Sequence, residues 1–349
     1  MRVAHHGLLC HNLHDMRLRT LLVAALAPAL LTAATAPGNH PTGTAGVFMV
    51  DKLGAHLRFF DPVTLAERSS LKLPTNPHDF AFSADHRRAY VPIYGPGIYG
   101  RNPEPKHQLY VIDLRKRAVA RVIDLLPYKG PHGVQVAPDG SLYVTAENDR
   151  KVLHVDPESG RILHAIDVEG SAHWIAILPD GSKLYVANKN DRLFVSVVDL
   201  KTRKVVARIP MPKGTQGIAS SPDGRTVVAM DYAAPVVAVI DPRTDQVVDR
   251  IALQGQTGGA YKAYFSPDGK WLLTMVDSMI TILDASNLQG LQRVLKVGAS
   301  PMGIGFSADG TTALVANHGD GTVSVVDLST ARVTRTFKAG TGIETLAYY

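Results

Sequence analysis

The sequence predicts an all-β fold in which seven copies of one four-stranded sheet form a ring. Three observations lead to this prediction: an aspartate that recurs at a nearly constant interval, a second turn signal that recurs with it, and short runs of β-branched and apolar residues between the turns. One sheet of four short strands cannot bury both of its faces, so each copy needs neighbouring copies to pack against.

Residues 301–340 show the repeated unit most clearly. Turn formers separate four β-rich runs, which lie at 303–307, 313–317, 322–327 and 333–338. Alternating apolar and polar residues bounded by Gly, Asp and Ser clusters are typical of short antiparallel strands. We therefore interpret the unit as four consecutive antiparallel strands.

An aspartate closes the third strand of each copy. Successive aspartates are 52, 43, 43, 42, 43 and 43 residues apart, at Asp61, Asp113, Asp156, Asp199, Asp241, Asp284 and Asp327. An aspartate side chain accepts hydrogen bonds from backbone N–H groups two residues further on and so starts a turn. We interpret the seven carboxylates as turn formers rather than as a functional set.

A second turn, between strands one and two, carries Asp-Gly in five copies and Asp85-His86 in a sixth. Six such turns against seven aspartates leave one copy divided between the ends of the repeat region. Residues 343–349 have the pattern of a first strand, and residues 46–73 that of strands two to four. We therefore predict one seven-bladed β-propeller over residues 46–349, with four antiparallel strands per blade and one blade shared between the N- and C-terminal ends, which closes the ring.

Residues 1–36 have the pattern of a leader and signal peptide. Arg17 and Arg19 precede an apolar run at 21–31, and residues 34–36 read Ala-Thr-Ala, which fits a cleavage site. The apolar run is too short for a membrane-spanning helix. We expect a periplasmic or secreted protein with no membrane span after cleavage, and translation starting at Met16.

Composition argues against several classes of function. The formal charge is +6, of which residues 1–36 contribute +2. The remaining charge is spread over the repeats without a basic run, so nucleic acid is not an expected partner. Cys10 is the only cysteine, so the chain has no disulfide, no cysteine nucleophile, no cysteine-based zinc site and no C-x-x-C-H motif for a covalent c-type haem.

The repeats resemble those of the YVTN-repeat β-propellers. Residues 217–224 read GIASSPDG, 184–188 read LYVAN and 195–199 read VSVVD, and the resemblance extends over residues 46–349. Ala146 stands where the family usually has Asn. The resemblance implies the fold and not one activity, because such propellers include quinoprotein amine dehydrogenase-like and haem-linked oxidoreductase domains, lactonases, lyases and binding proteins.

One face of the predicted ring departs from the repeat. In such a blade, the loop into strand one and the loop between strands two and three lie on one face, which we call the mouth face. The two aspartate turns lie on the other, the turn face. Seven residues before each first-turn aspartate, where the innermost strand begins, the sequence has Glu344 (by alignment), His78, His132, His173, Gln216, Tyr261 and Met302.

Four adjacent blades thus place Glu344, His78, His132 and His173 in a continuous arc at the channel mouth. Three imidazoles and a carboxylate suit a divalent metal such as Zn, Fe, Mn or Cu. The same groups suit a polar ligand or acid–base chemistry. A structural alternative is a wet channel lined by polar residues.

Further candidate contacts surround the arc. At the next position, where several blades have glycine, Trp174 and Lys262 would form a stacking wall and a charged clamp, or else blade packing and a solvated lysine. A long loop at 94–107 lies on the mouth face because it joins strands two and three, and long loops often serve as lids. It offers Tyr94, Tyr99, Arg101 and His107. Shorter loops at 148–150, 190–192 and 318–320 are expected to be solvated turns.

These residues leave several functions open. The first is a propeller that binds a small ligand, a metal ion or a partner protein at the channel mouth. The second is a metal-dependent or acid–base hydrolase or lyase, similar to lactonase-type propellers, that uses the histidine arc. The third is a partner domain for haem or quinone redox chemistry. DNA binding, described for some exported propellers of this type, is disfavoured by the modest charge.

Overall fold

The computed structural model describes residues 45–98 and 100–349. The described residues all belong to one compact unit. The predicted signal peptide, the expected start at Met16 and the loop residue Tyr99 lie outside them. Within the described residues, no helical segment has the length and apolar character that crossing a bilayer requires.

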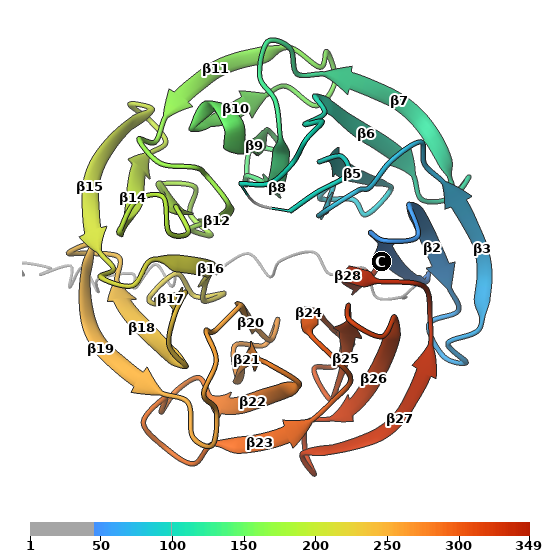
Figure 1. The fold of residues 1–349 in the computed structure, drawn as a ribbon, viewed down its shortest axis with the longest axis vertical. Coiled ribbons are helices and arrows are strands. Elements are labelled where there is room, and N and C mark those ends of the chain that lie inside the picture. The colour runs from blue at the N-terminus through green and yellow to red at the C-terminus, as the bar shows by residue number, and fades with distance from the viewer. Residues whose placement is uncertain (1–44, 99) are drawn as a thin grey trace, which may run out of the picture. The chain divides into compact units, whose positions relative to one another are not determined.

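The described residues form seven four-stranded antiparallel sheets around a central channel (Figure 1), which confirms the seven-bladed β-propeller. The strands of blades 1 to 3, from the channel outward, are β28 (Ile343–Tyr348), β1 (Val47–Asp51), β2 (His56–Phe60) and β3 (Glu67–Lys72); β4 (Ala81–Phe82), β5 (Arg88–Ile93), β6 (Gln108–Asp113) and β7 (Ala118–Asp124); β8 (Pro131–Val136), β9 (Leu142–Ala146), β10 (Lys151–Val155) and β11 (Ile162–Asp167).

Blades 4 to 7 follow the same order. Their strands are β12 (Trp174–Ile177), β13 (Lys183–Ala187), β14 (Phe194–Asp199) and β15 (Lys204–Pro210); β16 (Thr215–Ser220), β17 (Val227–Asp231), β18 (Val236–Asp241) and β19 (Gln246–Ala252); β20 (Lys262–Phe265), β21 (Trp271–Val276), β22 (Met279–Asp284) and β23 (Arg293–Lys296); β24 (Pro301–Phe306), β25 (Thr312–Asn317), β26 (Thr322–Asp327) and β27 (Arg332–Lys338).

Blade 1 closes the ring as predicted. β28 pairs antiparallel with β1, with Val47 opposite Tyr348 and Met49 opposite Leu346. The backbone N–H of Tyr349 donates to the carbonyl of Gly46 at 3.0 Å. Both edges that an open ring would expose are therefore paired with each other.

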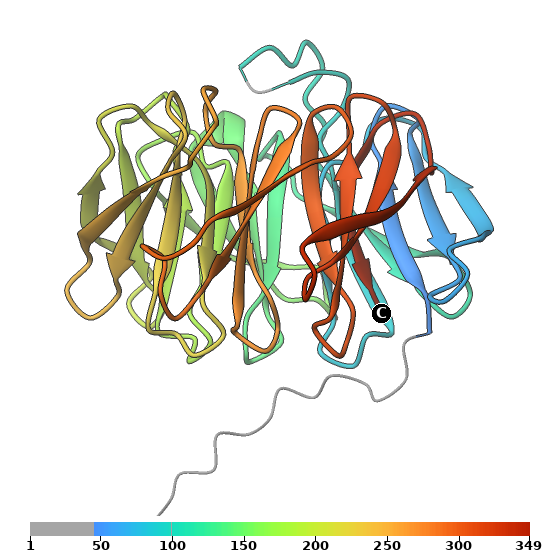
Figure 2. The same ribbon diagram turned by 90° about the horizontal axis from the view of Figure 1, so that it is seen from below.

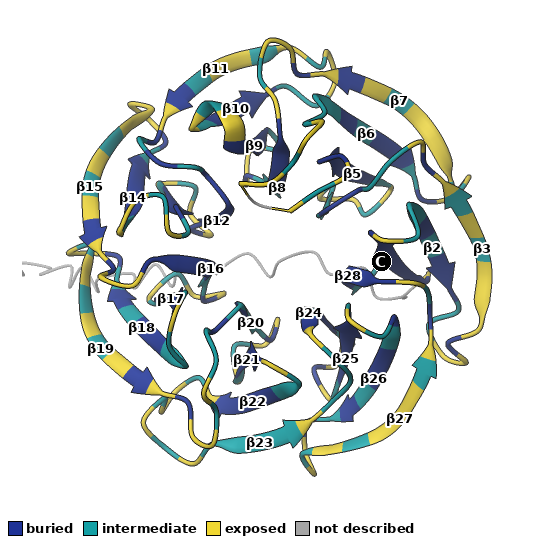
Figure 3. Ribbon diagram, in the orientation of Figure 1, coloured by how far each residue is buried: buried dark blue, intermediate teal, exposed yellow. Residues whose placement is uncertain are grey.

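The second strand of each blade is buried more fully than the outermost strand (Figure 3). Strands β1, β9 and β17 are buried at every residue, whereas the outermost strands, such as β15 and β19, alternate between exposed and half-buried residues. Seven apolar clusters each fill the space between two neighbouring blades. The core is therefore distributed around the ring, and the channel-facing positions are released from packing.

The turn face is regular. Each third-strand aspartate accepts a hydrogen bond from a backbone N–H two or three residues on, as Asp199 does from Thr202 at 2.7 Å and Asp327 from Thr330 at 2.9 Å. The first-turn aspartates do the same, as Asp180 does from Ser182 at 2.9 Å. His86, which departs from the Asp-Gly pattern, has a φ of 53°, close to the 67–85° of its glycine counterparts. The interpretation of these aspartates as turn formers is confirmed.

Candidate functional site

The three arc histidines lie together at the channel mouth. The ring centroids of His78 and His132 are 3.7 Å apart, and those of His132 and His173 are 3.9 Å apart. All three residues are at most 5% exposed. His132 lies in β8, and His78 and His173 come shortly before β4 and β12, so the start of the innermost strand positions all three.

A second ring of polar residues lies at the mouth; the sequence reasoning named Tyr94 as a candidate contact and missed the ring as a set. It consists of the polar residue that comes one position after strand two, or two positions after it in blade 4: Lys52, Tyr94, Glu147, Lys189, Tyr232, Asp277 and His318. The loop from strand two to strand three also lies on the mouth face, so these residues meet the starts of the innermost strands. The same counting that found the histidines, applied to strand two, finds this ring.

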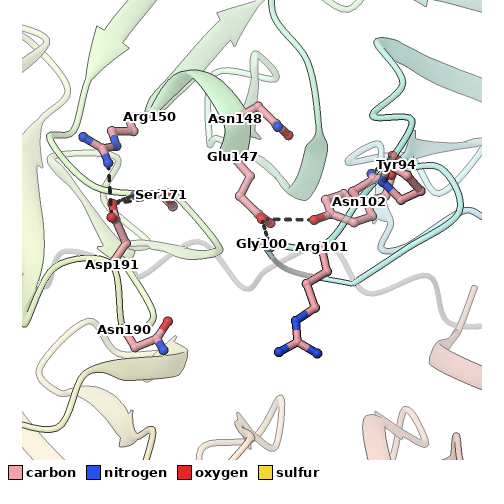
Figure 4. A pocket seen from close by; sticks show the side chains of 11 residues that line it. Tyr94, Gly100, Arg101, Asn102, Glu147, Asn148, Arg150, Ser171, Asn190 and Asp191 are labelled. Atoms are coloured by element: carbon pink, nitrogen blue, oxygen red, sulfur yellow. Dashed lines mark hydrogen bonds and ion pairs between the residues drawn. The ribbon is translucent and has the colours of Figure 1, made fainter.

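Glu147 joins this second ring to the histidines. Its Oε1 accepts hydrogen bonds from the Tyr94 hydroxyl at 3.0 Å and from the Gly100 backbone N–H at 3.3 Å (Figure 4). Its Oε2 lies 3.6 Å from Nδ1 of His173. Burial raises the pKa of Glu147 to about 7, against the two hydrogen bonds, which lower it. Near neutral pH this carboxyl is therefore poised between its acid and its ionised form.

His132, Glu147 and His173 have the arrangement of a metal-binding triad. One ligand atom from each lies within 4.8 Å of those of the other two. Nδ1 of His132 lies 3.1 Å from the carbonyl oxygen of His173, to which it donates as an N–H. That bond leaves Nε2 with its lone pair, and this buried atom has no hydrogen-bond partner among the described residues. Fixing one ring nitrogen by a carbonyl is how proteins orient a metal-ligating imidazole.

Glu344 makes a second cluster beside the first. Its two carboxylate oxygens lie 3.6 Å from Nε2 of His78 and 3.0 Å from Nδ1 of His318. Burial raises the pKa of Glu344, whereas Lys52 and His318 lower it. The lowering effects together are larger, so the pKa lies well below its usual range. The expectation that the turn at 318–320 is solvated is wrong for His318, because its ring turns inward to this carboxylate.

The electrostatics keep the arc histidines neutral. Burial lowers the pKa of each of the three well below its usual value, and Lys52 adds to the effect on all of them. The neighbouring imidazoles lower the pKa of His78 and His173 further. Neutral imidazole is the form that ligates metal ions. Lys189, at the same mouth, has its pKa lowered by burial to about 8.

The other predicted contacts fall in different places. Nζ of Lys262 lies 3.3 Å from the centre of the Trp174 ring, so these two do meet. Gln216 is buried in β16 of blade 5, the blade next to that of His173, and Tyr261 is half-buried directly before β20 of blade 6. His107 is not brought to the mouth, because its Nδ1 pairs with Asp124 of the outermost strand β7 at 2.8 Å.

A polar cavity of about 680 Å³ opens beside Glu147. The loop after β5, which rises above the blades (Figure 2), contributes Gly100, Arg101 and Asn102 to its wall. On the other side Arg150 pairs with Asp191 at 3.2 Å (Figure 4). The 94–107 loop therefore borders the cavity, as its position between strands two and three predicts.

Comparisons with known proteins agree on the fold. The Cytochrome D1 heme domain family matches residues 138–266. THO complex subunit 3 of Arabidopsis thaliana is 23% identical over 232 residues, which cover 66% of this chain and 70% of that protein. Hydrazine synthase of Kuenenia stuttgartiensis superposes with a TM-score of 0.67 at 19% identity, over 78% of this chain and 89% of that one. A functionally unknown protein from Desulfotomaculum acetoxidans superposes with a TM-score of 0.72 at 12% identity, over 87% and 98%.

A haem group does not fit in front of His132 as the neighbouring rings are arranged. The ring of His132 has His78, His173, Trp174 and Tyr94 around it, at centroid distances of 3.7, 3.9, 4.7 and 5.4 Å. A macrocycle needs an open face in front of its axial ligand, and these rings occupy that space. A single ion needs no such face. The comparisons agree with a seven-bladed β-propeller. The kind of ligand is argued below from the geometry of the mouth.

Proposed function

We propose that this protein is an exported propeller of the YVTN-repeat type that binds a divalent metal ion at the channel mouth through His132, Glu147 and His173. The observation that carries the proposal is that one ligand atom from each of these three residues converges within 4.8 Å. Nε2 of His132 is also buried and has no hydrogen-bond partner in the described residues. Two imidazoles and a carboxylate are a usual donor set for zinc and for other first-row metals.

The surroundings favour a site that binds a further small molecule. Three protein ligands leave a coordination position open. Glu147 lines the polar cavity, so that position has a route to solvent. Lys52 and Lys189 add positive charge at the mouth, as their effect on the His132 pKa shows. A small anionic ligand, such as a carboxylate, would balance the charge of the ion and the lysines.

Metal analysis and calorimetry test the proposal. The purified protein is stripped with a chelator and titrated with Zn²⁺ and Mn²⁺, in parallel with His132→Ala and His154→Ala. His154 is also a buried histidine, in β10, and serves as the matched control. We expect His132→Ala to weaken binding by about a hundredfold or more, since it removes a ligand, and His154→Ala to bind like the wild type. Protein that takes up no ion, or equal binding by both variants, contradicts the proposal.

The cavity beside Glu147 favours a second candidate function, metal-dependent hydrolysis. A bound ion with an open position activates water for attack on an ester or lactone carbonyl. The 680 Å³ cavity has room for such a substrate next to that position. Turnover of a panel of lactones and esters, lost on chelation and in His132→Ala, would establish it. Metal binding without turnover of any of them would leave a binding protein.

A further inference from the structure

A second cavity lies in the channel and has no lining residue in common with the polar cavity at the mouth. It has a volume of about 460 Å³ and is lined by the innermost strands of blades 2 to 6. Aromatic residues such as Phe80, Phe82 and Phe265 form its walls. It also reaches Pro222, beside the first-turn aspartate of blade 5, so it extends towards the turn face.

The side chains that shape this cavity follow an alternating pattern. One residue after the mouth position, blades 3, 5 and 7 have Gly133, Gly217 and Gly303, whereas blades 2, 4 and 6 have Asp79, Trp174 and Lys262. A Cβ at Gly217 would lie 2.5 Å from the carbonyl oxygen of Tyr261, so neighbouring strands are too close there for a side chain. The three larger residues instead project into the channel, and all three line the one cavity.

Lys262 is the unusual member of this trio. The residue is 5% exposed, and Nζ is buried with no hydrogen-bond partner among the described residues. Nζ lies over the face of Trp174, a contact that stabilises a cation. Burying an amine without a hydrogen bond is costly, and here burial lowers the pKa of Lys262 to about 8. A desolvated lysine of this kind is a nucleophile near neutral pH.

We propose that the channel cavity binds a small apolar aldehyde or ketone, which condenses with the amine of Lys262. The apolar walls accommodate the hydrocarbon part of the ligand, and the amine meets its carbonyl carbon. Asp79 lines the same cavity, and among the neighbouring charges it has the largest effect on the pKa of Lys262. Asp79 is therefore the acid available for the condensation.

The condensation balances with the groups present. The neutral amine adds to the carbonyl carbon, which forms the C–N bond, and one amine proton passes to the oxygen to give a carbinolamine. Asp79, as the carboxylic acid, protonates the hydroxyl, which leaves as water when the C–O bond breaks. The product is an iminium on Lys262, facing the Asp79 carboxylate and the Trp174 ring.

Reductive trapping tests this proposal on metal-free protein, which separates it from the metal site. The protein is treated with benzaldehyde and cyanoborohydride near neutral pH, and peptides are quantified by mass spectrometry. The exposed Lys201 reports unselective reaction. We expect Lys262 to be labelled about tenfold faster than Lys201, because more of it is the neutral amine at this pH. Labelling of exposed lysines alone would overturn the proposal.

One variant separates the chemical role of Asp79 from its charge. Asp79→Asn keeps the shape and removes the acid, so we expect slower labelling of Lys262. If Asp79 acted through charge alone, its loss would free more neutral amine and labelling would become faster, which would overturn its role as the acid. Thermal unfolding checks that the Asp79→Asn variant folds.

Discussion

The two faces of the propeller differ in how they use the same repeat. On the turn face seven aspartates occupy equivalent positions and all do the same thing, accepting hydrogen bonds from nearby backbone N–H groups. On the mouth face the equivalent positions carry His, Glu, Lys, Tyr, Gln, Asp and Met. Uniform positions maintain the blade, and the variable ones, which packing does not constrain, are available for chemistry. The predictions below test this division, starting with the strand that serves both roles.

The largest effect is expected from removing residues 343–349. Without β28 the inner edge of β1 is unpaired, and the apolar cluster between blades 7 and 1 loses Ile343 and Leu346. We expect loss of cooperative unfolding and aggregation through the open edge. Thermal unfolding and size-exclusion chromatography measure both, and an unchanged unfolding midpoint would show that the ring does not depend on this strand.

Glu147→Gln should separate function from fold at the mouth. The amide keeps the shape of the side chain and removes one of three proposed ligands, so we expect metal affinity to fall by about a hundredfold, or about 2.7 kcal/mol. Stability should stay the same or rise slightly, because a buried ionisable group is removed. Calorimetry and thermal unfolding measure the two quantities, and an equal loss in both would mean that Glu147 is structural.

The pH dependence of metal binding should follow Glu147. Its pKa is raised from an ordinary 4.5 to about 7, so below pH 7 a metal ion must displace a proton. We expect affinity to fall about tenfold for each pH unit below 7 and to level off above it. The same shift means that the folded state binds more protons than the unfolded one between these values, so this group's contribution to stability falls as pH rises from 4.5 through 7. Calorimetry across this range measures the affinity, and a flat profile would exclude proton release from Glu147.

The smallest effect is expected on the turn face. Asp199 accepts hydrogen bonds from the backbone N–H and the hydroxyl of Thr202, at 2.7 and 2.8 Å. Asp199→Ala should cost about 1 kcal/mol, as for comparable side-chain caps. Metal binding and labelling of Lys262 should remain unchanged. Denaturant unfolding measures the cost, and any loss of binding would break the proposed division between the two faces.

The repeat explains how much of the structure could be predicted. The aspartate interval and the two incomplete ends determine seven blades and the shared one, because each repeat obeys the same local turn chemistry. Counting back from the first turn also places His78, His132 and His173 correctly at the mouth. Glu147 was missed because only the start of the innermost strand was counted, although the residue after strand two has an equally regular position.

Counting positions along the repeat singled out Trp174 and Lys262 but did not show which side chains touch each other. Trp174 and Lys262 meet although blade 5 separates them in sequence, and they do so because Gly217 of blade 5 has no side chain between them. The ring of His318, in blade 7, turns inward because Glu344 of the neighbouring blade 1 pairs with it. Such contacts depend on how closely the strands converge on the channel, which one blade's sequence does not contain.

The ring-closing strand has a consequence for biosynthesis. β28 leaves the ribosome after every other strand of the ring, and it carries Glu344, whose carboxylate meets His78 and His318. A nascent chain therefore lacks a finished mouth until the moment its last blade is sealed. Closure of the fold and completion of this carboxylate cluster are a single event, so a chain that ends before β28 carries neither.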